Sequence, residues 1–206
     1  MKNVLIHVTV NGQRYVREVA SNQTLLRFLR EELFLNSVKE GCDEGECGAC
    51  TVLVDGHPVN SCLVLAAELD GKSVLTTEGL AQDARLHPIQ EAFIEAGAVQ
   101  CGYCTPGMLM SAVACINLYG HPTREQIRKE MEGNICRCTG YVKIIDGILL
   151  AAECFREGRL PEAEQDWRPG SRVCRVDAAE KVIGTGQYPD DIYMNGMLYG
   201  SAVRSR

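Results

Sequence analysis

The first part of the chain alternates apolar and polar residues with the period of a β-strand. Asn11-Gly12 separates two such runs, as in a β-hairpin with a two-residue turn. Apolar residues then recur at helical spacing over residues 24–34. The predicted strands are residues 4–10, 14–19, a second hairpin over 51–59, and 73–77. This order, ββαββ, predicts a small mixed sheet with one helix across it.

Beyond about residue 78 the apolar spacing becomes helical. Four helices are predicted, over residues 87–97, 106–120, 123–133 and 140–155. Thr123 and Gln126 have the spacing of a capping box, which starts the third of these helices. Pro106 suits a first helical turn and Gly120 suits a helix end. Four helices joined by short loops predict a compact bundle, so the fold class we expect is α+β.

The pattern divides the chain into four segments. Residues 1–78 and 79–156 are the expected sheet and helical domains, and residues 157–176, polar with two prolines, are a predicted linker. The closing segment, residues 177–206, is too short to bury a core of its own. We therefore expect that segment to be mobile by itself and to become ordered only against a partner.

Composition and charge narrow the choice of partners. The 206 residues carry a net charge of −6 without a run of Lys or Arg, which argues against nucleic acid or an anionic membrane. The N-terminus lacks the features of a secretory signal. No apolar stretch reaches the length of about 18 residues that predicts a membrane-spanning helix. We therefore expect a cytoplasmic protein.

Eleven cysteines are unusual for a cytoplasmic protein of this size. Disulfides are rare in the cytosol, and an odd number of cysteines cannot pair completely within one chain. A disulfide framework is therefore less favoured than metal binding as the explanation of the cysteines.

Four cysteines in the sheet half form the first cysteine set: Cys42, Cys47, Cys50 and Cys62. Their spacing begins C-x4-C-x2-C, which is typical of plant-type [2Fe–2S] proteins. Asp43, Glu44 and Glu46 lie among them and should raise the pKa values of the thiols, which is unfavourable for a nucleophile. A metal deprotonates its thiol ligands outright, so it accounts for cysteines in this setting. Zinc is the alternative, although this spacing does not divide into two zinc knuckles.

Four cysteines in the helical half form the second cysteine set: Cys101, Cys104, Cys136 and Cys138. Each pair directly precedes a predicted helix, with Thr105 and Thr139 as the expected caps. Helix N-termini favour anions, and a thiolate-ligated cluster is anionic. Taken alone, this set is also compatible with structural zinc. The remaining cysteines, for which packing in a core is expected, are Cys115, Cys154 and Cys174.

Three stretches of the sequence resemble the iron–sulfur part of the xanthine oxidase family of molybdenum hydroxylases. GCDEGECGACTVLVDG is similar to its ferredoxin-like cluster loop, and QCGYCTPGMLMSA and NICRCTGYVKIIDGI are similar to its helical cluster domain. The resemblance covers residues 1 to about 156. It implies a plant-type ferredoxin-like (β-grasp) domain followed by an all-α four-helix domain, each with one [2Fe–2S] cluster. It also implies that Gln100 and Cys138 lie against the pterin of a molybdenum cofactor.

The closing segment has a resemblance of its own. Its residues follow the pattern K-V-x-G-x-x-x-Y-x-x-D, which is similar to the opening of the molybdenum-binding subunit in the same family. Only about 20 residues precede it after the helical half, so no flavin domain lies between the two. The segment stops at Arg206, and we expect either a longer protein cut at this point or a subunit that carries a stub.

The resemblance implies an electron-transfer subunit or fragment of a molybdenum hydroxylase of the xanthine dehydrogenase or aldehyde oxidoreductase type. Such a chain is not catalytic alone. Its expected partners are a molybdenum-binding subunit and a FAD subunit or another electron acceptor. The alternatives are a free-standing ferredoxin-like carrier and a zinc module without redox function. Neither the substrate nor the final electron acceptor is specified by these residues.

Overall fold

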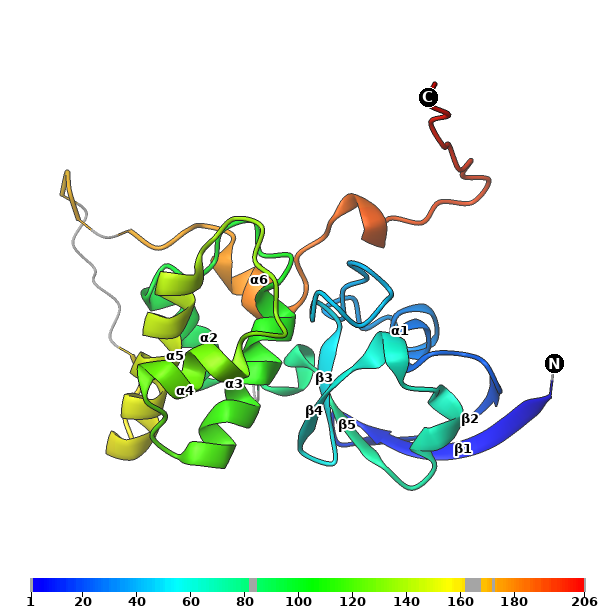
Figure 1. Cartoon of the computed structure of the whole chain (residues 1–206), viewed down its shortest axis with the longest axis horizontal. Coiled ribbons are helices and arrows are strands. Elements are labelled where there is room, and N and C mark those ends of the chain that lie inside the picture. Colours follow the sequence, from blue (N-terminus) through cyan, green and yellow to red (C-terminus); the bar gives the residue numbers. More distant parts are fainter. Residues whose placement is uncertain (1, 82–84, 162–167, 172, 206) are drawn as a thin grey trace.

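The protein has a sheet domain and a helical domain that lie against each other (Figure 1). The computed structural model describes the chain except for residues 1, 82–84, 162–167, 172 and 206, and the side chain of Asp190. The predicted linker, residues 157–176, therefore lies partly outside the described residues. Beyond residue 184 the chain leaves the helical domain and runs above the sheet domain toward the C-terminus in this view.

The sheet domain is built on five strands, which match the predicted ranges when both strands of the hairpin over residues 51–59 are counted; the ββαββ order is one strand short. The strands are β1 (Asn3–Val10), β2 (Gln13–Ala20), β3 (Thr51–Val54), β4 (His57–Asn60) and β5 (Ser73–Leu75). Their order across the sheet is β2-β1-β5-β3-β4, with only the β1–β5 pair parallel. Asn11 and Gly12 both have positive φ, 51° and 81°, as a type I′ hairpin turn requires.

The helical segment of the sheet domain is shorter and less regular than predicted. A single α-helical turn, α1 (Leu25–Arg27), continues into a π-helical turn over Phe28–Glu32. This wider turn buries Phe28, Leu29 and Arg30 in succession, whereas a regular amphipathic helix buries only one stripe. The apolar side chains of the segment pack with those of β1, β2, β3 and β5 in one core.

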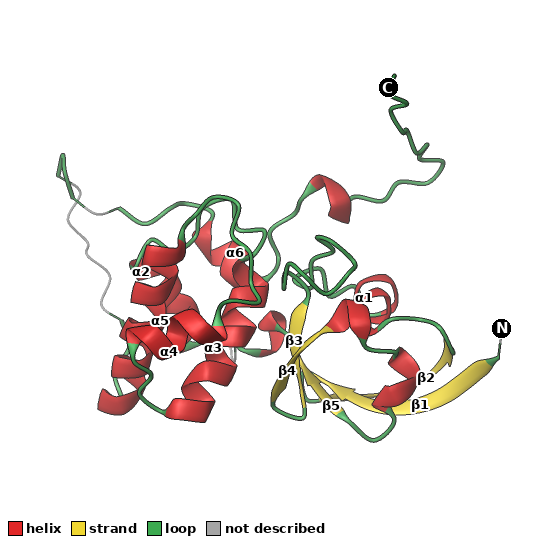
Figure 2. Ribbon diagram, in the orientation of Figure 1, coloured by secondary structure: helices red, strands yellow, loops and turns green. Residues whose placement is uncertain are grey.

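The described part of residues 79–156 forms four α-helices, as predicted, which pack together beside the sheet domain (Figure 2). They are α2 (Pro88–Glu95), α3 (Thr105–Tyr119), α4 (Arg124–Glu130) and α5 (Tyr141–Glu157). The capping box of Thr123 and Gln126 is present, and Gly120 ends α3 with a φ of 66°. Among the described helices, none combines the length and the apolar character that a membrane span requires.

The two predicted threonine caps are wrong. Cys104 is the N-cap residue of α3 and Gly140 is that of α5, while Thr105 is already helical and buried. Thr139 has a φ of 57°, a left-handed conformation that ends the preceding turn before α5 begins. The helices therefore start one residue away from the expected positions, and α3 begins directly after a cysteine.

Polar contacts join the two domains. The Ile135 N–H donates to the Cys47 carbonyl at 2.9 Å, and the Asn134 side-chain amide donates to the Gly48 carbonyl, also at 2.9 Å. Asn134 is buried and accepts a hydrogen bond from the Ser111 hydroxyl at 2.7 Å. A Cβ atom at Gly107 would lie 2.3 Å from the Gly48 carbonyl oxygen, so only glycine lets α3 approach this closely. The first cysteine loop, residues 41–50, is thus packed directly on the helical domain.

The expectation that the closing segment is ordered only by a partner is wrong for its first half. The helix α6 (Ala178–Ile183) packs against α2 and α3, and Ala178 and Val182 are part of the core of the helical domain. This half needs no core of its own, because two apolar side chains complete an existing one. The second half differs, since large apolar side chains such as Leu198 and Val203 are almost fully exposed.

Replacing Asn134 by Ala is expected to destabilise the protein by about 1–3 kcal/mol, because it removes the acceptor of the buried Ser111 hydroxyl and one of the hydrogen bonds to the Gly48 carbonyl, which keeps those from Thr51. Chemical unfolding followed by circular dichroism measures the loss. Asn117→Ala is the matched control, since Asn117 is exposed on α3. Equal stability of the two variants would contradict a structural role for the Asn134 amide.

Candidate metal centres

The first cysteine set is formed by the loop of residues 41–50 and the short turn Ser61–Leu63, which follows β4. The N–H groups of Glu44 and Cys47 both donate to the Cys42 sulfur, at 3.4 Å. A Cβ atom at Gly41 would lie only 2.7 Å from the Cys47 sulfur, so a glycine is required for this close approach. The backbone of the loop itself therefore surrounds the Cys42 and Cys47 sulfur atoms.

The pKa values in this loop differ from the sequence-based expectation. The pKa of Cys42 is lowered to about 7, because the backbone N–H groups of Glu44 and Cys47 stabilise its thiolate. The side chains of Asp43, Glu44 and Glu46 are exposed, and solvent screens their charges. The prediction that these carboxylates raise the thiol pKa values is therefore wrong for Cys42.

Two other thiols of the set, those of Cys47 and Cys62, behave in the opposite way. The pKa of Cys62 is raised to about 12, first by burial and then by the neighbouring Cys50 thiol. Burial likewise raises the pKa of Cys47. Such thiols lose their protons only to a strong local positive charge, which a bound metal centre supplies. The loop therefore combines one thiol that ionises readily with others that require the metal.

The second cysteine set lies where α3 and α5 begin. Cys101 and Cys104 belong to the turn before α3, and Cys136 and Cys138 belong to the turn before α5. The Gly140 N–H, at the start of α5, donates to the Cys136 sulfur at 3.3 Å. The helix end therefore directs positive polarity at this site, as predicted. Burial and neighbouring thiols raise the pKa of Cys104.

The thiols of each set interact with one another. In the first set Cys42 interacts with Cys47, and Cys62 with Cys50 and Cys42. In the second set Cys101 interacts with Cys138 and Cys136, and Cys104 with Cys136 and Cys101. Among the described Cys, His, Asp and Glu side chains, no three converge in a way that would hold one metal ion. Zinc needs four donors around a single ion, whereas a [2Fe–2S] cluster takes two donors on each of its two irons, so four associated thiols supply the number of donors that either centre needs.

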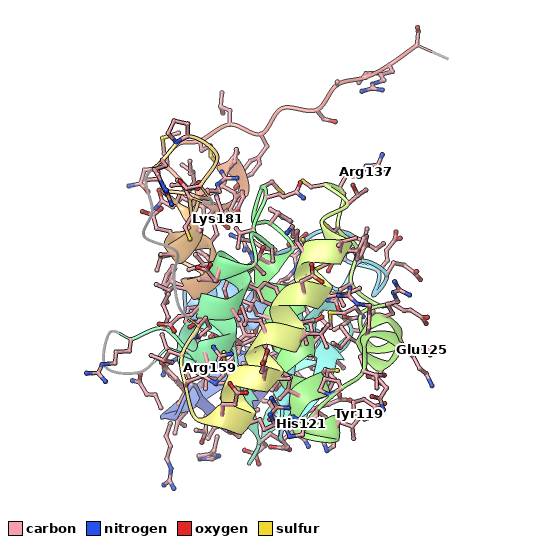
Figure 3. The ribbon with its side chains drawn as sticks, turned by 90° about the vertical axis from the view of Figure 1, so that its left-hand side faces the viewer. Tyr119, His121, Glu125, Arg137, Arg159 and Lys181 are labelled. Carbon is pink, nitrogen blue, oxygen red and sulfur yellow. The ribbon has the colours of Figure 1, made fainter. Side chains whose placement is uncertain are left out.

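The two sets differ in how open they are. In the second set Cys101 is exposed and Cys138 half-buried, whereas Cys136 is buried. Gln100 is also exposed, and its Nε2 atom lies 3.0 Å from where a Cβ atom of Gly140 would be. Arg137, between the two cysteines, lies at the same end of the helical domain as Lys181, opposite Tyr119 and His121 (Figure 3). Gln100 and Cys138, which the sequence singled out, therefore lie together on an open side.

The residues that connect the two sets were missed by sequence reasoning. The hydrogen bond from Ile135 to the Cys47 carbonyl links a cysteine of the first set to the residue before Cys136. Asn134 and Ser111 add the buried polar contacts beside it. In the sequence, Asn134 and Ile135 stand next to the C-x-C motif and Ser111 follows the C-x2-C motif. Neither residue type nor spacing indicates that these residues meet the loop of the first set.

The remaining cysteines are only partly as expected. Cys115 and Cys154 are 1% and 0% exposed and pack inside the helical domain. Burial raises the pKa values of both, that of Cys115 to about 11. Cys174 is half-buried, and its sulfur lies 3.9 Å from a carboxylate oxygen of Glu95. Core packing was therefore the wrong prediction for Cys174.

Comparisons with known proteins agree with this geometry. Residues 8–80 match a family described as a 2Fe-2S iron-sulfur cluster binding domain, and residues 76–149 match one described as a [2Fe-2S] binding domain. The nicotinate dehydrogenase small FeS subunit of Eubacterium barkeri is 48% identical, over 74% of this chain and 98% of the relative. The xanthine dehydrogenase iron-sulfur-binding subunit of Escherichia coli O157:H7 is 44% identical, over 72% of this chain and 94% of that subunit.

The chain belongs to the iron–sulfur subunits of the xanthine oxidase family of molybdenum hydroxylases. Their role is electron transfer, and they carry [2Fe–2S] clusters. The family assignment confirms the predicted fold class, with a ferredoxin-like domain followed by a helical [2Fe–2S] domain. A small FeS subunit works with partner subunits, in a complex that is an oxidoreductase.

Solved structures of the molybdenum hydroxylases extend the comparison. The aldehyde oxidoreductase from Desulfovibrio desulfuricans is 38% identical and superimposes with a TM-score of 0.85 over 91% of this chain. This chain spans only 22% of that structure. The quinoline 2-oxidoreductase structure from Pseudomonas putida 86 matches at 42% identity with a TM-score of 0.73, over 78% of this chain and 100% of that one.

We expect about four irons per chain and two distinguishable paramagnetic signals after reduction, because two ligand sets with different surroundings are present. Iron and sulfide analysis with electron paramagnetic resonance of the purified protein checks this. Stoichiometric zinc, or one signal at full iron loading, would contradict the assignment.

Replacing Cys115 or Cys154 by Ala is expected to keep both cluster signals and to cost about 1–3 kcal/mol in stability, since each change leaves a small buried void. Cys136→Ser is the comparison, because it removes a member of the second set and should abolish one signal only. Loss of a signal in Cys115→Ala or Cys154→Ala would show that the two sets are wrongly composed.

Proposed function

We propose that the two cysteine sets are the ligand sets of the two clusters, and that the chain conducts electrons between a molybdenum site on a partner and an acceptor. The clusters, when bound, each accept and release one electron at a time. The chain itself holds them in fixed positions and controls which side of each site is open. The residues assigned to the first cluster are Cys42, Cys47, Cys50 and Cys62. Those assigned to the second are Cys101, Cys104, Cys136 and Cys138.

The observation that carries this proposal is the direct connection between the two sets. The Cys47 carbonyl accepts the hydrogen bond of Ile135, whose carbonyl carbon is bonded to the nitrogen of Cys136. One hydrogen bond and a few covalent bonds therefore join a ligand of one site to a ligand of the other. Asn134, beside Ile135 at this junction, is buried, whereas Ile135 itself is about half exposed. A free-standing single-cluster carrier requires no such connection, and neither does a zinc module.

The open side of the second set is the proposed entry point for electrons. Gln100 and Cys138 are accessible there, in keeping with their family role beside the pterin of the molybdenum cofactor. The Arg175 guanidinium donates to the Gln100 carbonyl and also binds Asp177, so the backbone of Gln100 is held in place. The Gln100 side chain is thereby presented toward a partner surface, which we assign to the molybdenum-binding subunit.

The loop of the first set is the proposed exit point. Cys42 is only half-buried, and Asp43, Glu44 and Glu46 beside it are exposed. A FAD subunit or another one-electron acceptor would approach at these residues. We also place the protein in the cytoplasm, where free thiols outside the two sets, such as those of Cys115 and Cys154, stay reduced.

The complex would oxidise an aldehyde, a purine or another heterocycle at the molybdenum site, with oxygen derived from water. This chain supplies no group for that step. If the isolated chain hydroxylates such a substrate at a normal enzyme rate, the subunit assignment fails.

Replacing Gln100 by Trp is expected to slow reduction of the clusters by substrate in the assembled complex by roughly tenfold or more, because small displacements of reacting partners have costs of this order. Stopped-flow absorbance of the clusters measures the rate. Asn117→Trp, on the exposed face of α3, is the matched control. Unchanged cluster spectra with an unchanged rate in Gln100→Trp would place the entry point elsewhere.

A further inference from the structure

A short segment, residues 177–191, bridges the two domains. It starts as α6 on the helical domain and runs to the side of the sheet domain, where the 3-10 turn Pro189–Asp191 ends it (Figure 1). Nothing in the electron-transfer role by itself requires such a bridge. Its contacts, however, concentrate on residues next to the two cysteine sets.

Asp191 anchors the end of this segment. One of its carboxylate oxygens lies 2.5 Å from the Lys39 ammonium, and the other accepts a hydrogen bond from the Arg30 guanidinium at 2.9 Å. The side chains of Asp191, Lys39 and Arg30 are 0%, 1% and 7% exposed. Buried ionic contacts of this geometry fix the relative placement of the groups that form them more than they add stability.

Two tyrosines join this anchor to the cysteine sets. The Lys39 ammonium lies 4.4 Å from the centre of the Tyr188 ring and 5.9 Å from that of Tyr103, and the two rings meet edge to face. The Tyr188 hydroxyl donates to the Cys101 carbonyl at 2.9 Å. The Tyr103 hydroxyl donates to the Glu40 carbonyl at 2.7 Å. Tyr103 lies between Cys101 and Cys104, and Glu40 lies two residues before Cys42.

The residues of the pattern K-V-x-G-x-x-x-Y-x-x-D are the ones that make these contacts. Val182 is fully buried in the helical core. A Cβ atom at Gly184, where φ is 100°, would lie 2.4 Å from the Cβ atom of Ser37. Lys181 packs so closely on Gly102 that a Cβ atom there would lie 2.2 Å from its Cδ atom. With Tyr188 and Asp191, every specified position of the pattern lies against the part of the chain that holds the cysteine sets.

The first cysteine loop is therefore attached to the helical domain at both of its ends. Residues Cys47 and Gly48 bond directly to Ile135 and Asn134. Lys39 and Glu40, at the other end, contact Tyr103 and the bridging segment. A loop held at one end only could rotate about that contact, whereas contacts at both ends fix the orientation of the first cysteine loop.

We propose that residues 177–191 are a clasp that fixes the two cysteine sets relative to each other, and that Asp191 is its positioning residue. The clasp acts through Lys39 on the first set and through Tyr188 on the second. This proposal requires both clusters, but it does not depend on where electrons enter or leave. Its failure would therefore leave the proposed function intact.

The test compares Asp191→Asn with Asp70→Asn in the full, cluster-loaded chain. Asp70 is an exposed aspartate of the sheet domain that pairs with His7, so it controls for the loss of one carboxylate. In Asp191→Asn we expect roughly tenfold or faster amide exchange over residues 178–191, because the anchor of the segment is lost. We also expect a changed magnetic interaction between the two reduced clusters and an upward shift in the potential of the first cluster. The potential rises because a negative charge near an anionic site is removed.

Further variants separate positioning from charge alone. Asp191→Glu keeps the charge and should restore at least part of the protection and of the native magnetic interaction. Lys39→Gln combined with Asp191→Asn restores the net charge, and should return the potential toward native while the magnetic interaction stays altered. Tyr188→Phe removes the hydroxyl, with its bonds to the Cys101 carbonyl and the Lys181 ammonium, and should loosen the segment without disturbing the ionic contacts of Asp191.

Native exchange and a native magnetic interaction in both Asp191→Asn and Tyr188→Phe would overturn the proposal. It would also be overturned if the double variant recovered every native property, because the effect of Asp191 would then be purely electrostatic. If Asp191→Asn does not fold with both clusters, Tyr188→Phe and Asp191→Glu decide the question by the same measurements.

Discussion

The contact between the first cysteine loop and the turn before α5 is the constraint on which the rest of the structure depends. Two cores meet there through the Cys47 and Gly48 carbonyls, which accept hydrogen bonds from Ile135 and Asn134. The Ile135–Cys47 hydrogen bond joins two backbone groups and so allows little variation in distance, while Asn134 contributes its side-chain amide beside it. The glycine at position 107 has the same effect, since any side chain would push α3 away from the loop. The two sites are thus held at a distance defined by main-chain geometry.

The thiol environments follow from where the loops lie. At the half-exposed Cys42, backbone N–H groups favour the thiolate, whereas burial disfavours it at Cys62 and Cys104. Burial of neutral thiols costs little, and their ionisation requires the charge of a bound metal centre. Cluster assembly is therefore coupled to burial of the sites. The packing that buries the thiols of Cys62 and Cys104 also raises their pKa values, so their ionisation depends on the bound metal.

The closing segment shows how a short piece of chain gains structure from its neighbours. The helix α6 is only six residues long, yet Val182 is fully buried because it completes the core formed by α2 and α3. Beyond Asp191 the apolar side chains find no such surface among the described residues and stay largely exposed. The ordered half serves the contact between the two domains, and the exposed half offers apolar groups to whatever follows or binds.

The sequence by itself determined the elements and the ligand candidates, since these depend on local periodicity, on turn chemistry such as Asn11-Gly12, and on the spacing of cysteines. The family match confirms the fold class and the presence of the clusters. The assignment of individual cysteines stays a prediction, although the structure brings the thiols of each set together. Only the tertiary structure decided the pKa direction at Cys42, the caps of α3 and α5, and the docking of Asp191 on Lys39. These depend on backbone direction and on contacts between residues up to 152 positions apart, for which neither composition nor spacing carries a signal.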